Sequence, residues 1–228
     1  EQYVRNHDPE QKPLADYLCA VEPARPWEVL AITFTNKAAG ELKERLERML
    51  GADARDIWAA TFHSACVRIL RRFADRLGYQ KDFTIYDDSD SNKLTERIIK
   101  ELNLAERYNV KTLRGILSAA KGRYESPEEF RKNFKDTDHP KIPTVYEKYQ
   151  ASLRESNAMD FDDLLLQTNI LLKDCPDVLA KYQELFQYIL VDEYQDTNHM
   201  QYLLTALLAG GYENICVVGD VPLPRLCG

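Results

Sequence analysis

The 228-residue chain has few of the features that mark secreted, metal-bound or membrane proteins. Its five cysteines are scattered and no pair has C-x-x-C spacing, so neither a disulfide framework nor a zinc cage is expected. The longest apolar stretch, residues 203–209, is far below the roughly 20 residues of a membrane helix. The first residues are too polar for a secretory signal. A cytoplasmic protein without membrane contacts is therefore expected.

Glycine is scarce as well, with 9 residues in the chain and none before Trp27. A phosphate-binding loop has the pattern G-x-x-x-x-G-K-[ST], because its backbone N–H groups cradle phosphates and its lysine reaches the β- and γ-phosphates. No run of the 228 residues has this pattern. These residues therefore encode no phosphate site of that type.

Positive charge is also in deficit, since 30 Lys and Arg face 37 Asp and Glu. A chain that coats nucleic acid indiscriminately would usually be basic. The charges are unevenly distributed: residues 37–76 hold nine basic and six acidic side chains, whereas residues 160–228 hold three and eleven. One segment is suited to phosphates and the other to a cation.

Alternating patterns predict an α/β fold. Apolar, β-branched runs at 27–35, 57–63, 188–193 and 215–220 indicate buried strands, and helical spacing follows the first two runs. Ser64 is the expected N-cap of the second helix. Residues 87–173 show helical periodicity and almost no strand candidates. We predict a parallel sheet domain, formed by residues 1–80 and 175–228, that is interrupted by an all-helical insertion at 81–174.

Polar side chains follow all four predicted strands, at 33–37, 61–64, 191–196 and 218–220. Ligands of open α/β sheets bind outside the carboxyl ends of the strands. The coincidence of four polar strand ends therefore predicts a binding site at this edge.

The acidic strand end, VDEYQD, places Asp192 and Glu193 directly after four apolar residues. We expect a buried strand end, where adjacent carboxylates repel each other unless a cation or proton is present. Mg²⁺ accepts one or two carboxylates together with nucleotide phosphates. Asp192 is then the magnesium residue, and Glu193 orients the attacking water. The alternative is a solvated acidic turn.

The other two strand ends, TFTNK and TFHS, lie just before helix N-termini, where backbone N–H groups favour phosphate. Phe34 and Phe62 could stack on bases, which stabilises binding by roughly 1–3 kcal/mol per base in a sequence-tolerant way. The alternative is that both rings are core residues, that Thr33, Thr61 and Ser64 cap helices, and that His63 is structural.

Five ordered segments resemble the UvrD/PcrA/Rep helicases of superfamily 1. AITFTNKAAGELKERL resembles motif Ia, and TFHSACVRILRR resembles motif Ib. MDFDDLL resembles the approach to motif II, ILVDEYQDTN resembles motif II, and CVVGD resembles the start of motif III. The resemblance runs from about Trp27 to Asp220.

This resemblance implies an ATP-dependent DNA translocase and helicase, with a RecA-like, P-loop-NTPase-type domain 1A and a helical domain 1B. ATP and Mg²⁺ are the implied cofactors, and single-stranded DNA or single/double-strand junctions are the implied partners. Asp192, Glu193 and Gln195 become the implied catalytic residues, with Asp192 on Mg²⁺ and Asp220 as a further nucleotide contact. The implied DNA contacts are Thr33, Phe34, Thr35, Asn36, Lys37, Thr61, Phe62 and His63.

Departures from the family pattern limit this expectation. The 228 residues contain no phosphate-loop pattern, VPLPRLCG replaces the acidic-Gln-Ser-Ile-Tyr run after motif III, and no second motor domain is expected within these residues. We therefore expect this chain alone to hydrolyse no ATP. Two other functions stay open: a non-catalytic module that binds single-stranded DNA or docks a partner, and a recombination nuclease-helicase subunit. Nothing predicts an oligomeric state, although an exposed sheet edge would invite pairing of two copies.

Overall fold

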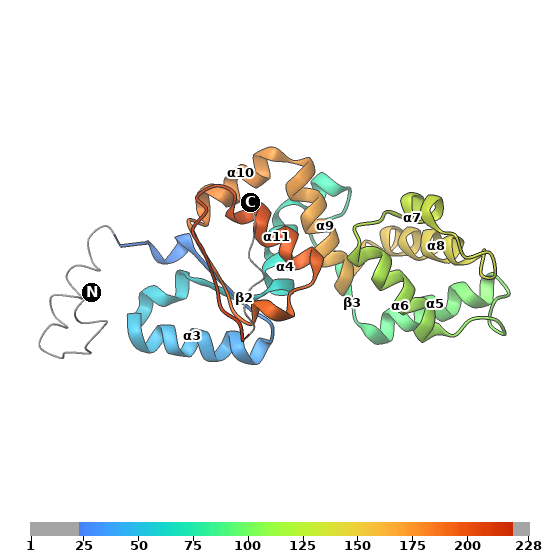
Figure 1. The fold of residues 1–228 in the computed structure, drawn as a ribbon, viewed down its shortest axis with the longest axis horizontal. Helices are drawn as coiled ribbons and strands as arrows, with labels where there is room; N and C mark the ends of the chain where they lie inside the picture. The colour runs from blue at the N-terminus through green and yellow to red at the C-terminus, as the bar shows by residue number, and fades with distance from the viewer. Residues whose placement is uncertain (1–22, 221–228) are drawn as a thin grey trace, which may run out of the picture.

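The computed structural model describes residues 23–220, which form two lobes side by side (Figure 1). We define the α/β lobe as residues 23–86 and 161–220, and the helical lobe as residues 87–160. Residues 1–22 and 221–228, which belong to the predicted sheet domain, lie outside the described residues.

The α/β lobe contains most of the strands. Its elements are η2 (Pro26–Glu28), β1 (Val29–Thr33), α3 (Asn36–Leu50), η3 (Gly51–Asp56), β2 (Trp58–Thr61), α4 (Phe62–Phe73), η4 (Ala74–Leu77), β3 (Thr84–Tyr86), α9 (Phe161–Asp174), α10 (Pro176–Leu185), β5 (Tyr188–Val191), η5 (Tyr194–Asp196), α11 (His199–Ala209) and β6 (Ile215–Val217). The helical lobe consists of α5 (Asp88–Glu101), α6 (Val110–Gly122), α7 (Pro127–Asn133), α8 (Ile142–Glu155) and β4 (Ala158–Asp160).

A four-stranded parallel sheet organises the α/β lobe, with the strand order β2-β1-β5-β6. The register pairs Thr33 with Thr61 and Ile32 with Val191, so the carboxyl ends of β2, β1 and β5 are level. Helix α3 lies on one side of this sheet, and α4, α9 and α11 lie on the other (Figure 1). The predicted α/β class with a parallel sheet is confirmed.

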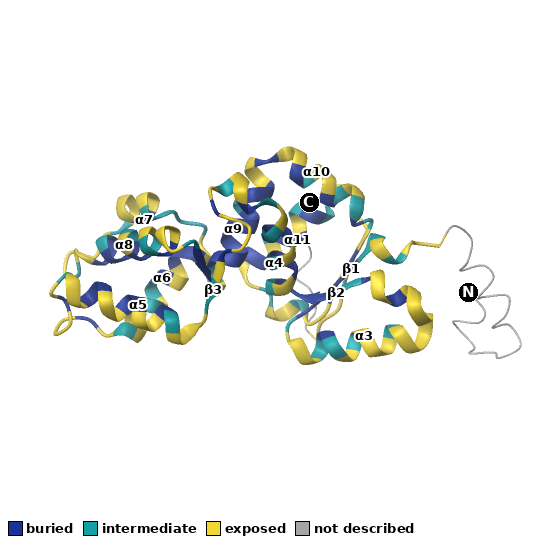
Figure 2. Ribbon diagram, turned by 180° about the vertical axis from the view of Figure 1, so that it is seen from behind, coloured by how far each residue is buried: buried dark blue, intermediate teal, exposed yellow. Residues whose placement is uncertain are grey.

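Burial differs between the two halves of the sheet. Strand β1 is buried on both faces, as expected from its apolar run (Figure 2). The prediction of buried strands is wrong for β5 and β6, because every second residue of β5 is exposed and β6 has no buried residue. The exposed side chains are Tyr188, Leu190, Ile215 and Cys216. Along the described residues, no element covers this face of β5 and β6.

Two hydroxyl caps explain where the helices after β1 and β2 begin. Thr35 Oγ1 accepts a hydrogen bond from Ala38 N at 3.1 Å, and Thr61 Oγ1 accepts one from Ser64 N at 3.2 Å. The prediction of Ser64 as N-cap is wrong, because the N-cap of α4 is Thr61, three residues earlier. Phe62 is buried as the first residue of α4, so the strand ends one residue before it, at Thr61.

A small sheet that periodicity did not predict joins the two lobes. Strands β3 and β4 pair in parallel, with Tyr86 opposite Asp160, where the chain enters and leaves the lobe. The expectation of almost no strands between residues 87 and 173 is therefore wrong at 158–160. Each strand has only three residues, too few for a recognisable alternation.

The two lobes have separate hydrophobic cores. The buried residues of α9 pack with the sheet lobe, although the predicted boundary assigned them to the insertion. Helices α5, α6 and α8 supply most of the other core. No helix within residues 23–220 is long and apolar enough to cross a membrane.

Candidate nucleic-acid and nucleotide site

The carboxyl edge of the sheet brings the predicted strand ends together. Thr33 lies beside Thr61 in the register, and Asp192 directly follows Val191, the partner of Ile32. Asp192 N also donates a hydrogen bond to Ile32 O at 3.0 Å. The acidic end and the two phenylalanine-bearing ends therefore occupy neighbouring strands of one edge.

The first strand end divides into buried and exposed residues. Thr33 is buried and its hydroxyl donates to Thr35 O at 3.3 Å. Phe34 is half-buried, and its ring meets Phe62 edge-to-face at 5.6 Å. Asn36 and Lys37 are exposed in the first turn of α3, and Lys37 lies 3.9 Å from Glu41. Asn36 and Lys37 are therefore accessible to the phosphates of a nucleic acid. Thr33 is not, and its role is to hold the backbone at Thr35 in place.

The second strand end presents one ring and hides the other. Phe62 is 1% exposed, which argues against a direct contact with DNA and gives it the role of supporting Phe34. Thr61 is buried, and its hydroxyl donates a hydrogen bond to Ser64 Oγ at 2.9 Å. His63 is half-buried, and burial lowers its pKa while Asp162 partly offsets the effect. A neutral imidazole thus faces the surface at neutral pH.

A groove of about 430 Å³ joins both strand ends and adds a ring from α9. Phe34, Asn36 and His63 line it together with Phe161, whose side chain is 47% exposed. The rings of His63 and Phe161 meet edge-to-face at 5.6 Å. Sequence reasoning did not assign Phe161 to the site, although an exposed phenylalanine within MDFDDLL, between two acidic residues, was the available signal.

The acidic strand end is open to solvent. Asp192, Glu193, Gln195 and Asp220 are all exposed. The expectation of a buried carboxylate pair is therefore wrong: the chain turns out of the sheet after Val191, and the solvated acidic turn describes these residues better. Asp192 Oδ1 accepts a hydrogen bond from Glu193 N at 2.9 Å, and Glu193 has a left-handed backbone with φ of 49°.

Gly219 permits the close approach of two loops at this end. A Cβ atom at Gly219 would lie 2.5 Å from Gln195 Oε1. The same contact is reinforced by a backbone hydrogen bond from Tyr194 N to Val218 O at 2.8 Å. The segment after β6 therefore lies against the Gln195 loop, which brings two of the sequence-predicted segments together.

Comparison with known proteins identifies the family. The model of the UvrD/REP helicase N-terminal domain matches residues 14–222, most of the chain. The chain belongs to the UvrD/REP helicase N-terminal domain family. The resemblance found in the motifs is thereby confirmed.

Curated relatives of this UvrD/REP domain are ATP-dependent DNA helicases named PcrA. The Bacillus subtilis protein is 48% identical over 205 residues, which are 90% of this chain and 28% of the relative. The PcrA proteins of Staphylococcus epidermidis and Staphylococcus aureus are each 45% identical over the same shares. The chain thus spans just over a quarter of the length of these relatives.

The donor set of the UvrD/REP domain constrains how it could hold Mg²⁺. Within residues 23–220, no group of three or more His, Cys, Asp and Glu side chains could hold a metal ion. Mg²⁺ usually keeps several waters and binds through one or two carboxylates plus substrate phosphates. The exposed carboxylates of Asp192 and Glu193 fit a magnesium ion that arrives with a nucleotide, and they do not fit a resident metal.

Proposed function

We propose that this chain is the amino-terminal motor region of an ATP-dependent DNA helicase, and that the groove at the carboxyl edge of its sheet binds single-stranded DNA. The observation that carries the proposal is the groove itself, which gathers Phe34, His63 and Phe161 from three separate segments. In this reading the α/β lobe is the RecA-like domain 1A and the helical lobe is domain 1B.

Two kinds of contact support single-stranded DNA as the ligand. The N-termini of α3 and α4, with Asn36 and Lys37 exposed in the first turn of α3, favour phosphates. The exposed faces of Phe161 and Phe34 suit base stacking, which every base can provide. The bases of a duplex are stacked on one another, so the bases of an unpaired strand are freer to stack on these rings.

For the nucleotide, we propose that Asp192 holds Mg²⁺ through water and that Glu193 orients the attacking water, with Gln195 and Asp220 beside them. A bound magnesium nucleotide would supply the reactive phosphate. The 228 residues contain no phosphate loop. We therefore propose that this stretch binds DNA but releases no phosphate from ATP, which for the isolated chain is the behaviour of a binding module.

The hydrophobic cores support a revised domain boundary. Since α9 packs with the α/β lobe, we propose that domain 1B comprises residues 87–160 instead of 81–174. The described cysteines Cys66, Cys175 and Cys216 are free thiols, which supports a reducing compartment such as the cytoplasm.

Fluorescence anisotropy with a labelled oligothymidine tests the DNA proposal. Phe34→Ala is expected to weaken binding about tenfold, within the roughly 1–3 kcal/mol of one stacked base. Tyr212→Ala is the matched control, because Tyr212 is an exposed ring near the start of β6, at the opposite edge of the sheet. Binding that ignores Phe34, or that does not weaken with added salt, would contradict the proposal. Phosphate release with Mg²⁺-ATP and DNA should stay at the protein-free baseline.

A further inference from the structure

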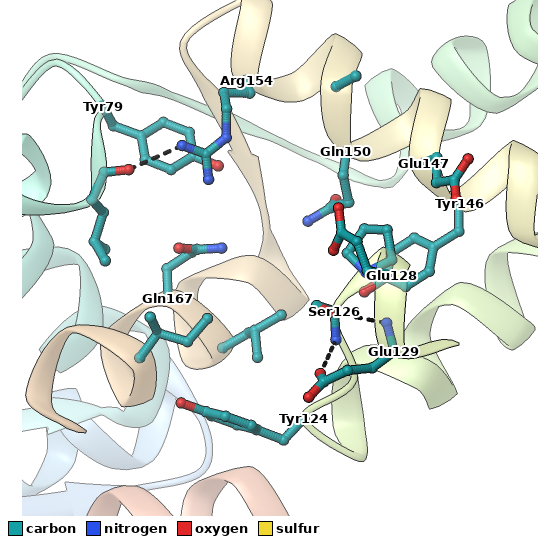
Figure 3. A pocket seen from close by; sticks show the side chains of 15 residues that line it. Tyr79, Tyr124, Ser126, Glu128, Glu129, Tyr146, Glu147, Gln150, Arg154 and Gln167 are labelled. Carbon is teal, nitrogen blue, oxygen red and sulfur yellow. Dashed lines mark hydrogen bonds between the residues drawn. The ribbon is translucent and has the colours of Figure 1, made fainter. Parts of the chain in front are cut away.

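The cavities of this chain differ in whether their charged side chains already have partners. A cavity of about 440 Å³ lies between the two lobes, and Glu147 and Arg154 are among the residues that line it (Figure 3). Glu147 pairs with Arg131, and the Arg154 guanidinium lies over the Tyr79 ring at 4.8 Å and donates to Leu77 O at 3.0 Å. These charges are engaged within the protein, so they do not select a ligand.

The groove of the proposed DNA site has the opposite character. Among the described residues that line it, Arg68 on α4 is the one charged side chain. Burial is the main cause that lowers the pKa of Arg68, and the positive charge of Arg72 adds to the effect, whereas Tyr182 opposes it. An arginine side chain nevertheless stays charged at neutral pH. Arg68 therefore brings to the groove a positive charge that no described carboxylate neutralises.

An aromatic platform holds the Arg68 guanidinium. Its Cζ lies 3.6 Å from the centre of the Trp58 ring. Trp58 meets the buried rings of Phe186 at 4.9 Å and Tyr182 at 6.2 Å, both edge-to-face. A guanidinium that stacks on a ring keeps its N–H groups available, and their planar fork matches two oxygens of a phosphate. The stacking therefore fixes the cation without using its hydrogen bonds.

The four arginines of residues 68–76 divide into two pairs. Arg71 donates to a backbone carbonyl at 2.8 Å, and Arg76 forms an ion pair with Asp177 at 2.9 Å. Arg68 and Arg72 are exposed, and neither forms an ion pair with a described residue. The two arginines without a carboxylate partner are thus the one that lines the groove and its neighbour one turn along the helix.

These two arginines continue a stripe of exposed donors along α4. Ser64, Arg68 and Arg72 are spaced by four residues, so they lie on one face of the helix, about 5–6 Å from one to the next. Ser64 and Arg68 line the groove, and Arg72 follows one turn later. The stripe begins in the first turn of α4, where backbone N–H groups also favour phosphate. Its spacing suits successive phosphates of an extended strand.

We propose that Arg68 is the phosphate clamp of the groove and that Arg72 binds the next phosphate of the same strand, so that bound single-stranded DNA leaves the sheet edge along α4. This inference rests on the proposed DNA function and adds the path of the strand to it. Phe34 and Phe161 stack on bases. Trp58 is a positioning residue, which acts on the DNA through Arg68.

The salt dependence of DNA binding tests the clamp. Fluorescence anisotropy measures the affinity of the 228-residue chain for a labelled oligothymidine of roughly 12 nucleotides at several salt concentrations. Arg68→Gln is expected to weaken binding about tenfold at low salt. It should also reduce the slope of log Kd against log salt by about 0.7, the contribution of one phosphate of a single strand. An unchanged slope overturns the proposal. Arg48→Gln, in the last turn of α3, is the matched control and should change neither quantity.

Strand length separates the two arginines. Arg72→Gln should weaken binding of the long oligothymidine about threefold, because one phosphate contact is lost. It should leave binding of a strand of roughly 4 nucleotides unchanged, because such a strand fills only the groove. Arg68→Gln should weaken binding of both strands. If Arg72→Gln affected both lengths equally, or neither, the path along α4 would be wrong.

A double substitution tests the role of Trp58. Trp58→Leu should lower the affinity and the salt slope in the parent chain, and it should lower neither further in the Arg68→Gln background. Equal losses in both backgrounds would make Trp58 a packing residue and overturn its positioning role.

The proposed DNA function and this inference fail in different ways. Oligothymidine binding that ignores Phe34→Ala removes the proposed function, and this inference with it. Binding that depends on Phe34 but not on Arg68 overturns the inference alone.

Discussion

The two lobes treat their charged residues in opposite ways. At the carboxyl edge of the α/β lobe, Asp192, Glu193 and Lys37 are exposed, and the ion pair found among them in the described residues is the 3.9 Å contact of Lys37 with Glu41. Where the helical lobe meets α9, Lys121 is 1% exposed and lies 2.7 Å from Asp160 and 2.9 Å from Asp163. The charges at the sheet edge stay hydrated, whereas the charges that hold two elements together are desolvated and paired.

The buried cluster connects the two lobes. Tyr149 on α8 donates to Asp160 Oδ2 at 2.9 Å, and Lys121 extends from α6. Asp160 and Asp163 form the capping box that begins α9. Burial opposes the charge of Lys121, yet Asp163 and Asp160 together raise its pKa. Phe161, which directly follows Asp160 in the chain, lines the groove of the proposed DNA site, so the contacts of the helical lobe help to fix one ring of that site.

The largest expected effect comes from removing the buried cation. Lys121→Met leaves the buried Asp163 without a cation and leaves Asp160 with only Arg114, 3.6 Å away, so it should lower the free energy of unfolding by about 3–5 kcal/mol. Urea denaturation followed by circular dichroism measures the loss. Lys111→Met, at an exposed position of the same helix, should change stability by less than about 0.5 kcal/mol. If both substitutions lowered the free energy of unfolding equally, the buried pairing of Lys121 would not be what stabilises the junction of the two lobes.

An intermediate effect is expected on the exposed side. Phe161→Ala should weaken binding of single-stranded DNA by about 1–2 kcal/mol, roughly tenfold, and leave stability almost unchanged because the ring is half exposed. Anisotropy titration and urea denaturation of the same preparation separate the two quantities. A large loss of stability with normal DNA affinity would make Phe161 a packing residue.

A smaller effect is expected from pH. Burial raises the pKa of Asp163 to about 6 despite the attraction of Lys121. Between the usual aspartate pKa and about 6, the folded state holds a proton that the unfolded state has lost, so this group contributes less stability as pH rises through that window. Asp163→Asn should therefore gain stability relative to the parent chain between pH 4 and 7, on the order of 1 kcal/mol. A constant difference in unfolding free energy across this range would contradict the raised pKa.

The last prediction concerns reactivity within the α/β lobe. Burial raises the pKa of the Cys66 thiol to about 12, and Cys175 is buried as well, whereas Cys216 on β6 is exposed. Iodoacetamide should modify Cys216 in the native protein and reach Cys66 and Cys175 only after denaturation, as mass mapping can show. Protection of Cys216 would mean that the outer face of β6 is covered.

The sheet was predictable because each strand is a short apolar run, and the polar ends were predictable because parallel strands share one edge. What sequence could not decide was packing. The period of α9 is helical in either lobe, so only contacts assign residues 164–172 to the sheet. Two hydroxyls three residues apart, Thr61 and Ser64, both suit an N-cap, and the burial of Phe62 decides between them. Asp192 is exposed because the chain turns out of the sheet after Val191, and the apolar run of β5 does not predict this turn.

The three-residue pair β3 and β4 has a consequence for modularity. The chain leaves the α/β lobe after Tyr86 and returns to it after Asp160, and these two residues are partners in the parallel pair of β3 and β4. An excursion whose two ends adjoin can change in length or content without moving the scaffold that carries it. The helical lobe is thus inserted at one place in the α/β lobe. A change in the length or content of this insertion would leave the four-stranded parallel sheet and its carboxyl edge in place.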